Sequence, residues 1–75
     1  MDGADFLTEL QDLLQRDEAL TPDMPLRDLP EWDSMSMMAV AGFFDQRFGL
    51  TLNFGDFESC VTVEDLMRKA GLGRP

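Results

Sequence analysis

Three prolines constrain this chain more than any other feature, because Pro22, Pro25 and Pro30 fall within one short stretch. Proline fixes its own backbone torsion and has no N–H group to donate, so residues 17–33 cannot form a continuous helix. The stretch is too apolar for a free linker, and we predict a long ordered loop. Loops of this length in small domains are often functional, and a plain connection between two helices is the alternative. Five apolar side chains would hold the loop to the protein body: Leu20, Met24, Leu26, Leu29 and Trp32.

The residues before this loop have the periodicity of an amphipathic helix. We predict that helix from about residue 4 to residue 16, with Glu9 and Asp12 on its polar side. Asp2 or Asp5 suits its N-terminal end, where negative charge is favourable. Its apolar face consists of Phe6, Leu10, Leu13 and Leu14.

After the loop, a second helix is predicted from Asp33 or Ser34 to Phe48, with Gly49 as a left-handed stop. This helix is apolar nearly all round, and a chain of 75 residues is too short to bury it completely. Its core side should hold Met37, Val40, Ala41, Phe44 and Phe48. The opposite side should hold Met35, Ala39, Gly42 and Gln46, with Met38, Phe43 and Asp45 at its borders.

The exposed side of this second helix is a candidate docking surface, because flexible methionine side chains adapt to more than one partner. An ordinary core helix with a few exposed methionines is the alternative. We assign the surface to Met35, Met38, Ala39 and Gly42.

In the remaining third of the chain, we predict two shorter helical segments. Residues 50–54 read as a buried loop, and residues 56–60 as a short helical turn. Thr62 and Asp65 have the spacing of a capping box that opens a last helix over residues 63–70. Its inward side would be Val63, Leu66 and Met67, and Gly71 would end it.

These elements define an all-α fold, a small four-helix bundle with three main helices, one short helix and a long ordered loop after the first helix. We expect residues 1–75 to form a single domain, with residues 1–3 and 72–75 frayed.

Charge limits the partners that this chain can bind. Fifteen acidic and six basic residues give a formal net charge of −9, which disfavours nucleic acid and anionic membranes. Basic protein surfaces are the natural partners, although the charge could also serve solubility alone. No stretch is long and apolar enough to span a membrane. The acidic N-terminus lacks the basic start of a signal peptide, so we expect a cytoplasmic protein.

The residues give little support for catalysis. The chain has no histidine, and Asp33 is a neighbour of Ser34 that would not face it on a helix. The only lysine, Lys69, belongs to the last predicted helix. Cys60 cannot form an intrachain disulfide, and its acidic surroundings should raise the pKa of its thiol. We therefore expect no enzyme and no metal site.

Ser34 is better explained as a residue that is covalently modified than as a catalytic nucleophile. Ser34 stands where the acidic loop meets a helix without net charge, and it is accessible there to a modifying enzyme. The start of a helix favours a phosphate ester through its N–H groups and partial positive charge. The alternative is that Asp33 or Ser34 is only the helix cap.

Asp33-Ser34-Met35, which opens an apolar helix after a proline-bearing loop, resembles the phosphopantetheine attachment motif of acyl carrier proteins, usually Asp-Ser-Leu. The resemblance covers most of the chain. Residues 6–14 resemble the first helix of that family, residues 26–29 its apolar loop anchor, and residues 48–50 the end of its second helix. Residues 62–66 are similar to the Thr-Val-x-Asp-Leu start of its last helix. The sequence Trp-Asp-Ser-Met at residues 32–35 is similar to the one in discrete carrier proteins of specialised pathways.

The resemblance implies that Ser34 takes 4′-phosphopantetheine from coenzyme A through a dedicated phosphopantetheinyl transferase. The thiol of that arm would hold an acyl or aminoacyl group as a thioester. Asp33 would help to dock the transferase and other basic partners, and Met35 and Met38 would supply the apolar part of the docking surface. The core between the second, third and fourth predicted helices would shelter part of the acyl chain that the arm carries.

One departure from the family concerns the exposed side of the second helix. Fatty-acid carriers usually have several acidic residues there, whereas this chain has Asp45 beside Ala39, Gly42 and Gln46. A more apolar surface favours dedicated partner enzymes over those of the main fatty-acid pathway. We predict a freestanding, monomeric acyl carrier protein. A peptidyl or aminoacyl carrier and a small acidic helical interaction module that carries nothing are the alternatives.

Overall fold

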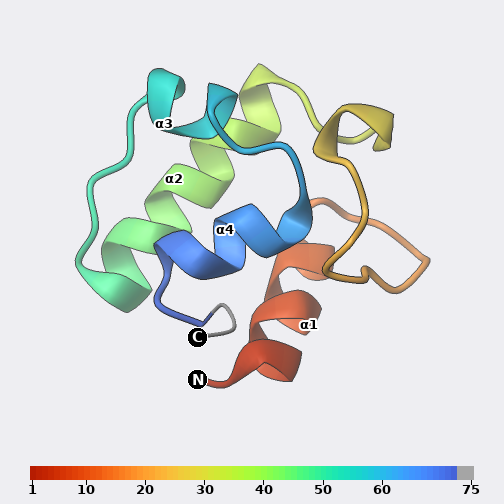
Figure 1. Ribbon diagram of the computed structural model, residues 1–75, viewed down its shortest axis with the longest axis horizontal. Helices are drawn as coiled ribbons and strands as arrows, with labels where there is room; N and C mark the ends of the chain where they lie inside the picture. Colours follow the sequence, from red (N-terminus) through yellow and green to blue (C-terminus); the bar gives the residue numbers. More distant parts are fainter. Residues whose placement is uncertain (73–75) are drawn as a thin grey trace.

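The computed structural model describes residues 1–72, which contain helices and no β-strand. Figure 1 shows α3 beside the N-terminal part of α2, and the long loop between α1 and α2 running past the start of α4. The predicted all-α fold with one short helix is confirmed. Its elements are α1 (Gly3–Leu13), the 3₁₀ helix η1 (Leu26–Asp28), α2 (Ser34–Phe48), α3 (Phe54–Glu58) and α4 (Val63–Lys69).

Helix α1 begins one residue before the predicted start and ends three residues before the predicted end. The Asp2 carboxylate accepts a hydrogen bond of 2.9 Å from the Asp5 N–H group, so Asp2 is the cap and Gly3 is helical rather than frayed. At the other end, Gln15 has a φ of 54°. A non-glycine residue in the left-handed region cannot continue an α-helix. The predicted helical end at Arg16 was therefore too late.

The loop between α1 and α2 is ordered and anchored, as predicted. Leu20, Leu26 and Leu29 are buried, and Met24 and Trp32 pack against the core. Three backbone hydrogen bonds also tie the loop to the segment before and at the start of α4. They run from Leu26 N–H to the Val61 carbonyl (2.9 Å), from Val63 N–H to the Met24 carbonyl (3.0 Å) and from Glu64 N–H to the Pro22 carbonyl (2.8 Å).

A cluster of phenylalanines joins α1 to α2. The Phe6 ring lies 5.8 to 6.2 Å from three rings of α2, measured between centroids. The predicted core side of α2 is confirmed, since Val40 and Phe44 have no exposed surface and Met37, Ala41 and Phe48 pack against the core. The placement of Phe43 at the border of the exposed side was wrong. Phe43 is only 8% exposed, because α1 covers it with Phe6.

The chain after α2 turns at Gly49, which has the predicted left-handed conformation, with a φ of 65°. Residues 49–53 form a loop in which Leu50 and Leu52 are half-buried. Helix α3 begins at Phe54, two residues before the predicted start, because the Asn53 side chain caps it. It also ends at Glu58, two residues before the predicted end.

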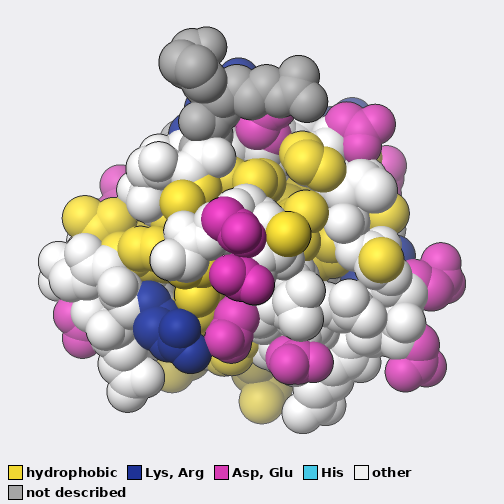
Figure 2. Space-filling view, turned by 90° about the horizontal axis from the view of Figure 1, so that it is seen from below, with side chains coloured by type: hydrophobic (Ala, Val, Ile, Leu, Met, Phe, Trp, Pro, Cys, Tyr) yellow, Lys and Arg dark blue, Asp and Glu magenta, His cyan; other side chains and the backbone are white. Residues whose placement is uncertain are grey.

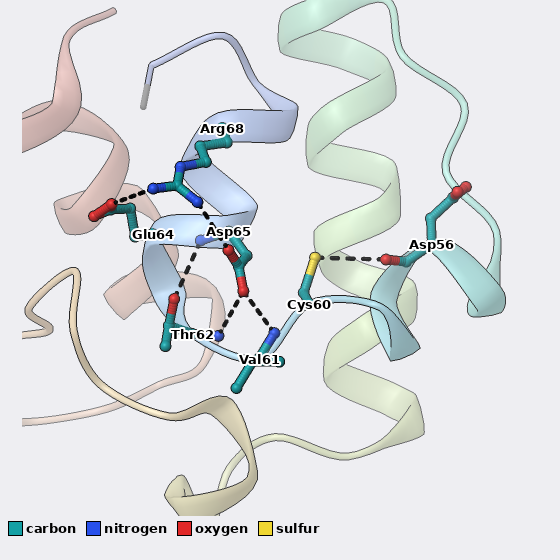
Figure 3. A network of polar contacts seen from close by, with 7 residues as sticks. All are labelled: Asp56, Cys60, Val61, Thr62, Glu64, Asp65 and Arg68. Atoms are coloured by element: carbon teal, nitrogen blue, oxygen red, sulfur yellow. Dashed lines mark hydrogen bonds and ion pairs between the residues drawn. The ribbon is translucent and has the colours of Figure 1, made fainter. Parts of the chain in front are cut away.

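Helix α4 begins with the predicted capping box, drawn in Figure 3. The Asp65 carboxylate accepts hydrogen bonds from the Val61 and Thr62 N–H groups at 2.8 and 3.1 Å. The Thr62 hydroxyl in turn accepts one from the Asp65 N–H group. The predicted inward residues Val63, Leu66 and Met67 are all buried. The helix ends at Lys69, followed by a left-handed Gly71 with a φ of 80°.

The surface reflects the acidic composition. Figure 2 shows Asp and Glu side chains spread over the face seen from below, with fewer Lys and Arg side chains among them. None of the helices in the described part of the chain is long and apolar enough to cross a membrane. Of the predicted C-terminal frayed end, residues 73–75 lie outside the described residues. Leu72 itself packs against the core and donates a backbone hydrogen bond of 2.8 Å to Met67.

Candidate functional site

At the start of α2, the two residues that cap the helix are distinct from the serine that follows the first of them. The Asp33 carboxylate accepts a hydrogen bond of 2.9 Å from the Ser36 N–H group, and the Ser36 hydroxyl lies 2.9 Å from the same carboxylate. Asp33 and Ser36 therefore form a reciprocal capping box. Ser34 is exposed, and its hydroxyl forms no hydrogen bond with any residue of the described range 1–72. Helix capping therefore accounts for the positions of Asp33 and Ser36, whereas the Ser34 side chain takes no part in the cap.

The charge next to Ser34 is negative. Hydrogen bonds from the Ser36 backbone and side chain, with a smaller contribution from the Met35 N–H group, hold the pKa of Asp33 below its ordinary value. Asp33 is therefore ionised at neutral pH. Because its carboxylate already occupies the Ser36 N–H group, a phosphate on Ser34 could not take that donor without displacing the cap. A group attached to the Ser34 oxygen would instead extend outward from the helix start.

Exposed apolar side chains surround this serine. Met35 is 78% exposed, Met38 75% and Phe54 56%. Beside Ser34, α2 and α3 enclose a hollow of about 310 Å³ with a nearly wholly apolar wall. Its lining consists of Ser34, Met37, Met38, Ala41, Leu52, Asn53, Phe54 and Phe57.

The predicted docking residues are all exposed, but those that border a hollow do not share the same one. Met38 belongs to the hollow beside Ser34, whereas Ala39 and Gly42 border a second hollow between α1 and α2. Gly42 leaves that surface open, since a Cβ atom built there would meet nothing within 4 Å. Asp45 is exposed one turn further along the helix.

The sequence interpretation missed Phe54 as part of this site. Phe54 is the first residue of α3, a helix of five residues that is too short to show a periodic pattern. The prediction of a buried loop over residues 50–54 was wrong at Phe54, which is 56% exposed. Only the packing of α3 against α2 brings its ring to the edge of the hollow beside Ser34.

The residues that could have supported catalysis do not gather at Ser34. Cys60 is buried at 8% exposure, and burial raises the pKa of its thiol more than the neighbouring charges do. Lys69 ends α4, where it borders a hollow with Cys60 and Asp65 rather than with Ser34. Within residues 1–72, no group of three or more His, Cys, Asp or Glu side chains is placed to hold a metal ion.

The exposed Ser34 hydroxyl at the start of α2 is chemically able to accept a covalently attached group. The comparison with protein families shows the class of protein to which the chain belongs. Residues 4–69 match the family model described as "phosphopantetheine attachment site", and the chain belongs to this phosphopantetheine-binding family. Its members carry covalently attached 4′-phosphopantetheine and act as carriers rather than as catalysts. Searches of curated proteins and of solved structures gave no significant match.

Proposed function

We propose that Ser34 is the attachment residue for phosphopantetheine, and that the chain is an acyl carrier. The observation that carries this proposal is the free, exposed hydroxyl of Ser34 beside a cap formed by Asp33 and Ser36. The family match, which spans this position, supports the same assignment. The reacting oxygen is accessible to a transferase, because the Ser34 side chain is exposed at the start of α2.

In the proposed modification, the Ser34 hydroxyl oxygen forms a new bond to the pantetheine-linked phosphorus of coenzyme A. The pyrophosphate bond breaks, adenosine 3′,5′-bisphosphate leaves, and the hydroxyl proton passes to a base of the transferase. The attached arm supplies a terminal thiol that holds the cargo as a thioester. Asp33 keeps the first turn of α2 intact throughout, because its carboxylate remains bonded to Ser36.

The docking surface is proposed from exposure and charge. Met35 and Met38 present apolar surface close to Ser34 in the first turns of α2, and Asp33 adds a negative charge beside it. Partners with apolar contact surfaces and basic rims would complement them. These partners are a phosphopantetheinyl transferase and enzymes that load and transfer acyl groups. The proposed surface consists of Asp33, Met35, Met38, Ala39, Gly42 and Asp45.

The apolar hollow beside Ser34 supports an acyl group as cargo over an aminoacyl group. A charged ammonium would lose hydration without gaining a partner among the apolar side chains that line it. The scarcity of acids on the exposed side of α2 favours a specialised pathway, such as one for a modified fatty acid or a polyketide, over the main fatty-acid pathway. A peptidyl or aminoacyl carrier is the alternative. A monomeric state and a cytoplasmic location stay predictions.

The test is incubation with coenzyme A and a broad-specificity phosphopantetheinyl transferase, followed by intact-protein mass. We expect the mass to rise by one phosphopantetheine group. Ser34→Ala should abolish the increase, whereas the control Ser59→Ala, at another exposed serine, should retain it. Both variants should keep the wild-type helical spectrum. An unchanged mass of the wild type, under conditions that load a control carrier, would contradict the proposal and favour a non-carrier interaction module.

A further inference from the structure

A chain of polar contacts links the end of α1 to the residues next to Ser34. The Arg16 Nη1 atom lies 3.0 Å from the Glu31 Oε1 atom. The backbone carbonyl of the same Glu31 accepts a hydrogen bond from the Ser36 hydroxyl. The Ser36 hydroxyl also lies 2.9 Å from the carboxylate of Asp33, the residue immediately before Ser34. Glu31 is therefore fixed twice, by its side chain to Arg16 just beyond α1 and by its backbone to Ser36 of α2.

The backbone at the end of α1 places Arg16 for this contact. Gln15 adopts the left-handed conformation, with a φ of 54°, and turns the chain out of the helix just before Arg16. The Gln11 side chain then donates hydrogen bonds to the carbonyls of Arg16 (3.0 Å) and Asp17 (3.3 Å). A left-handed non-glycine residue costs free energy, so the surrounding contacts must hold it in place.

The Arg16 side chain is largely shielded from water. It is only 13% exposed, and its Nε atom is buried without a hydrogen-bond partner among residues 1–72. A buried donor without a partner is unfavourable, whereas an exposed arginine would be fully hydrated. The arrangement is therefore better explained by the position that it gives Glu31 than by the free energy that it adds to the fold.

We propose that Arg16 and Glu31 are positioning residues that hold Ser34 in the orientation in which the modifying transferase accepts it. Neither residue touches the Ser34 hydroxyl. They act through the Glu31 carbonyl, the Ser36 hydroxyl and the Asp33 carboxylate, which together fix the turn that precedes Ser34. This inference rests on the proposed attachment of phosphopantetheine to Ser34.

The chain offers a matched control for the Arg16–Glu31 ion pair. In α4, Glu64 pairs with Arg68 at 3.1 Å, as Figure 3 shows, and the Glu64 side chain is 26% exposed against 30% for Glu31. Glu31→Gln and Glu64→Gln each remove one negative charge and one ion pair. Only the first change touches the segment before Ser34.

The experiment compares these two variants in full-length protein by transferase kinetics and by amide resonances. Glu31→Gln should lower kcat/KM for phosphopantetheine transfer about tenfold, because small displacements of a reacting group are costly. Glu64→Gln should stay within about twofold of the wild type. The amide shifts and hydrogen exchange of Ser34 and Met35 should change only in Glu31→Gln, and they do not depend on loading. The double variant Arg16→Glu/Glu31→Arg should recover part of the lost kcat/KM.

The outcomes separate this inference from the proposed function. Wild-type protein that is never loaded contradicts the attachment proposal, and the positioning role then fails with it. Loading of Glu31→Gln at the rate of Glu64→Gln, with unchanged Ser34 and Met35 amides, overturns the positioning role alone. If Glu31→Gln does not fold, Ser36→Ala tests the same contact chain. Its loading should fall, and Ser36→Thr, which keeps the hydroxyl, should restore it.

Discussion

Helices α2 and α4 begin with the same capping chemistry but place the first helical residue in opposite environments. Each has a reciprocal capping box, Asp33 with Ser36 in α2 and Thr62 with Asp65 in α4. The first residue after the α4 cap, Val63, has no exposed surface, whereas Ser34 of α2 is exposed. The caps stabilise both helices. The residue after each cap differs in its environment, because Val63 packs into the core and Ser34 faces solvent.

The α4 start is built into the core. Its capping residues lie beside the loop that crosses from α1 to α2, and the Val63 and Glu64 N–H groups bond to that loop. The α2 start faces outward, and its apolar neighbours Met35 and Met38 are more than two-thirds exposed. The comparison therefore separates a helix start that holds the fold together from one that presents a side chain.

Exchanging the residue types of Val63 and Ser34, the first residues of α4 and α2, should give the largest difference in the free energy of unfolding. Val63→Ser removes fully buried apolar surface and places a hydroxyl in the core, which should cost about 3 kcal/mol of unfolding free energy. Ser34→Val changes an exposed side chain and should alter it by less than about 0.5 kcal/mol. Urea denaturation followed by circular dichroism measures both. Comparable losses in the two variants would show that Ser34 has a structural role, against the comparison above.

Much of this contrast could be predicted from the sequence, because caps and stops depend on a few local residues. Thr62 and Asp65 have capping-box spacing, Gly49 can adopt a left-handed turn without strain, and both appear as predicted. The fold class and the core sides of α2 and α4 followed from helical periodicity. Ser34 was predicted as the attachment residue from its motif and its place at the end of the loop, and this assignment stays a prediction.

The remaining features depend on contacts that no local pattern contains. The end of α1 is set by Gln15, a residue type that rarely adopts a positive φ. The burial of Phe43 depends on the ring of Phe6 in another helix, and the hollow beside Ser34 depends on where α3 packs. The contact from Arg16 to Glu31 joins the two ends of the long loop, which are 15 residues apart in the sequence. None of these four features can be predicted from the spacing of residues along a single helix or loop.

Lowering the pH should weaken the α4 cap by a moderate amount. Hydrogen bonds from the Val61 and Thr62 N–H groups hold the pKa of Asp65 below its ordinary value. A carboxyl group with a lowered folded-state pKa stabilises the fold above its unfolded pKa, and this stability is lost as the pH falls through the folded pKa. We therefore expect the Asp65 contribution to be complete at neutral pH and to decline below about pH 4.

Asp65→Asn isolates that contribution. At neutral pH the variant should be less stable than the wild type by about 1 kcal/mol, the usual size of a cap, and the difference should shrink as the pH falls below about 4. Denaturation midpoints from pH 7 to pH 3 measure it. Asp33→Asn should show the same direction, because the pKa of Asp33 is lowered by the same kind of contact. A stability gap that is constant with pH would show that the charge of Asp65 does not act through the cap.

The smallest effect on folding is expected at the exposed side of α2. Met38 is 75% exposed, so Met38→Glu should change the free energy of unfolding by less than about 0.5 kcal/mol. The added charge would nevertheless lie in the apolar surface beside Ser34 and would have to lose its hydration when a partner covers it. We expect phosphopantetheine transfer to slow several-fold. Val61→Glu is the control, because Val61 is 62% exposed and lies outside the hollow beside Ser34. A sharp fall in melting temperature for Met38→Glu would instead assign Met38 to the core, whereas equal slowing in both variants would show that added negative charge, and not the docking surface, limits transfer.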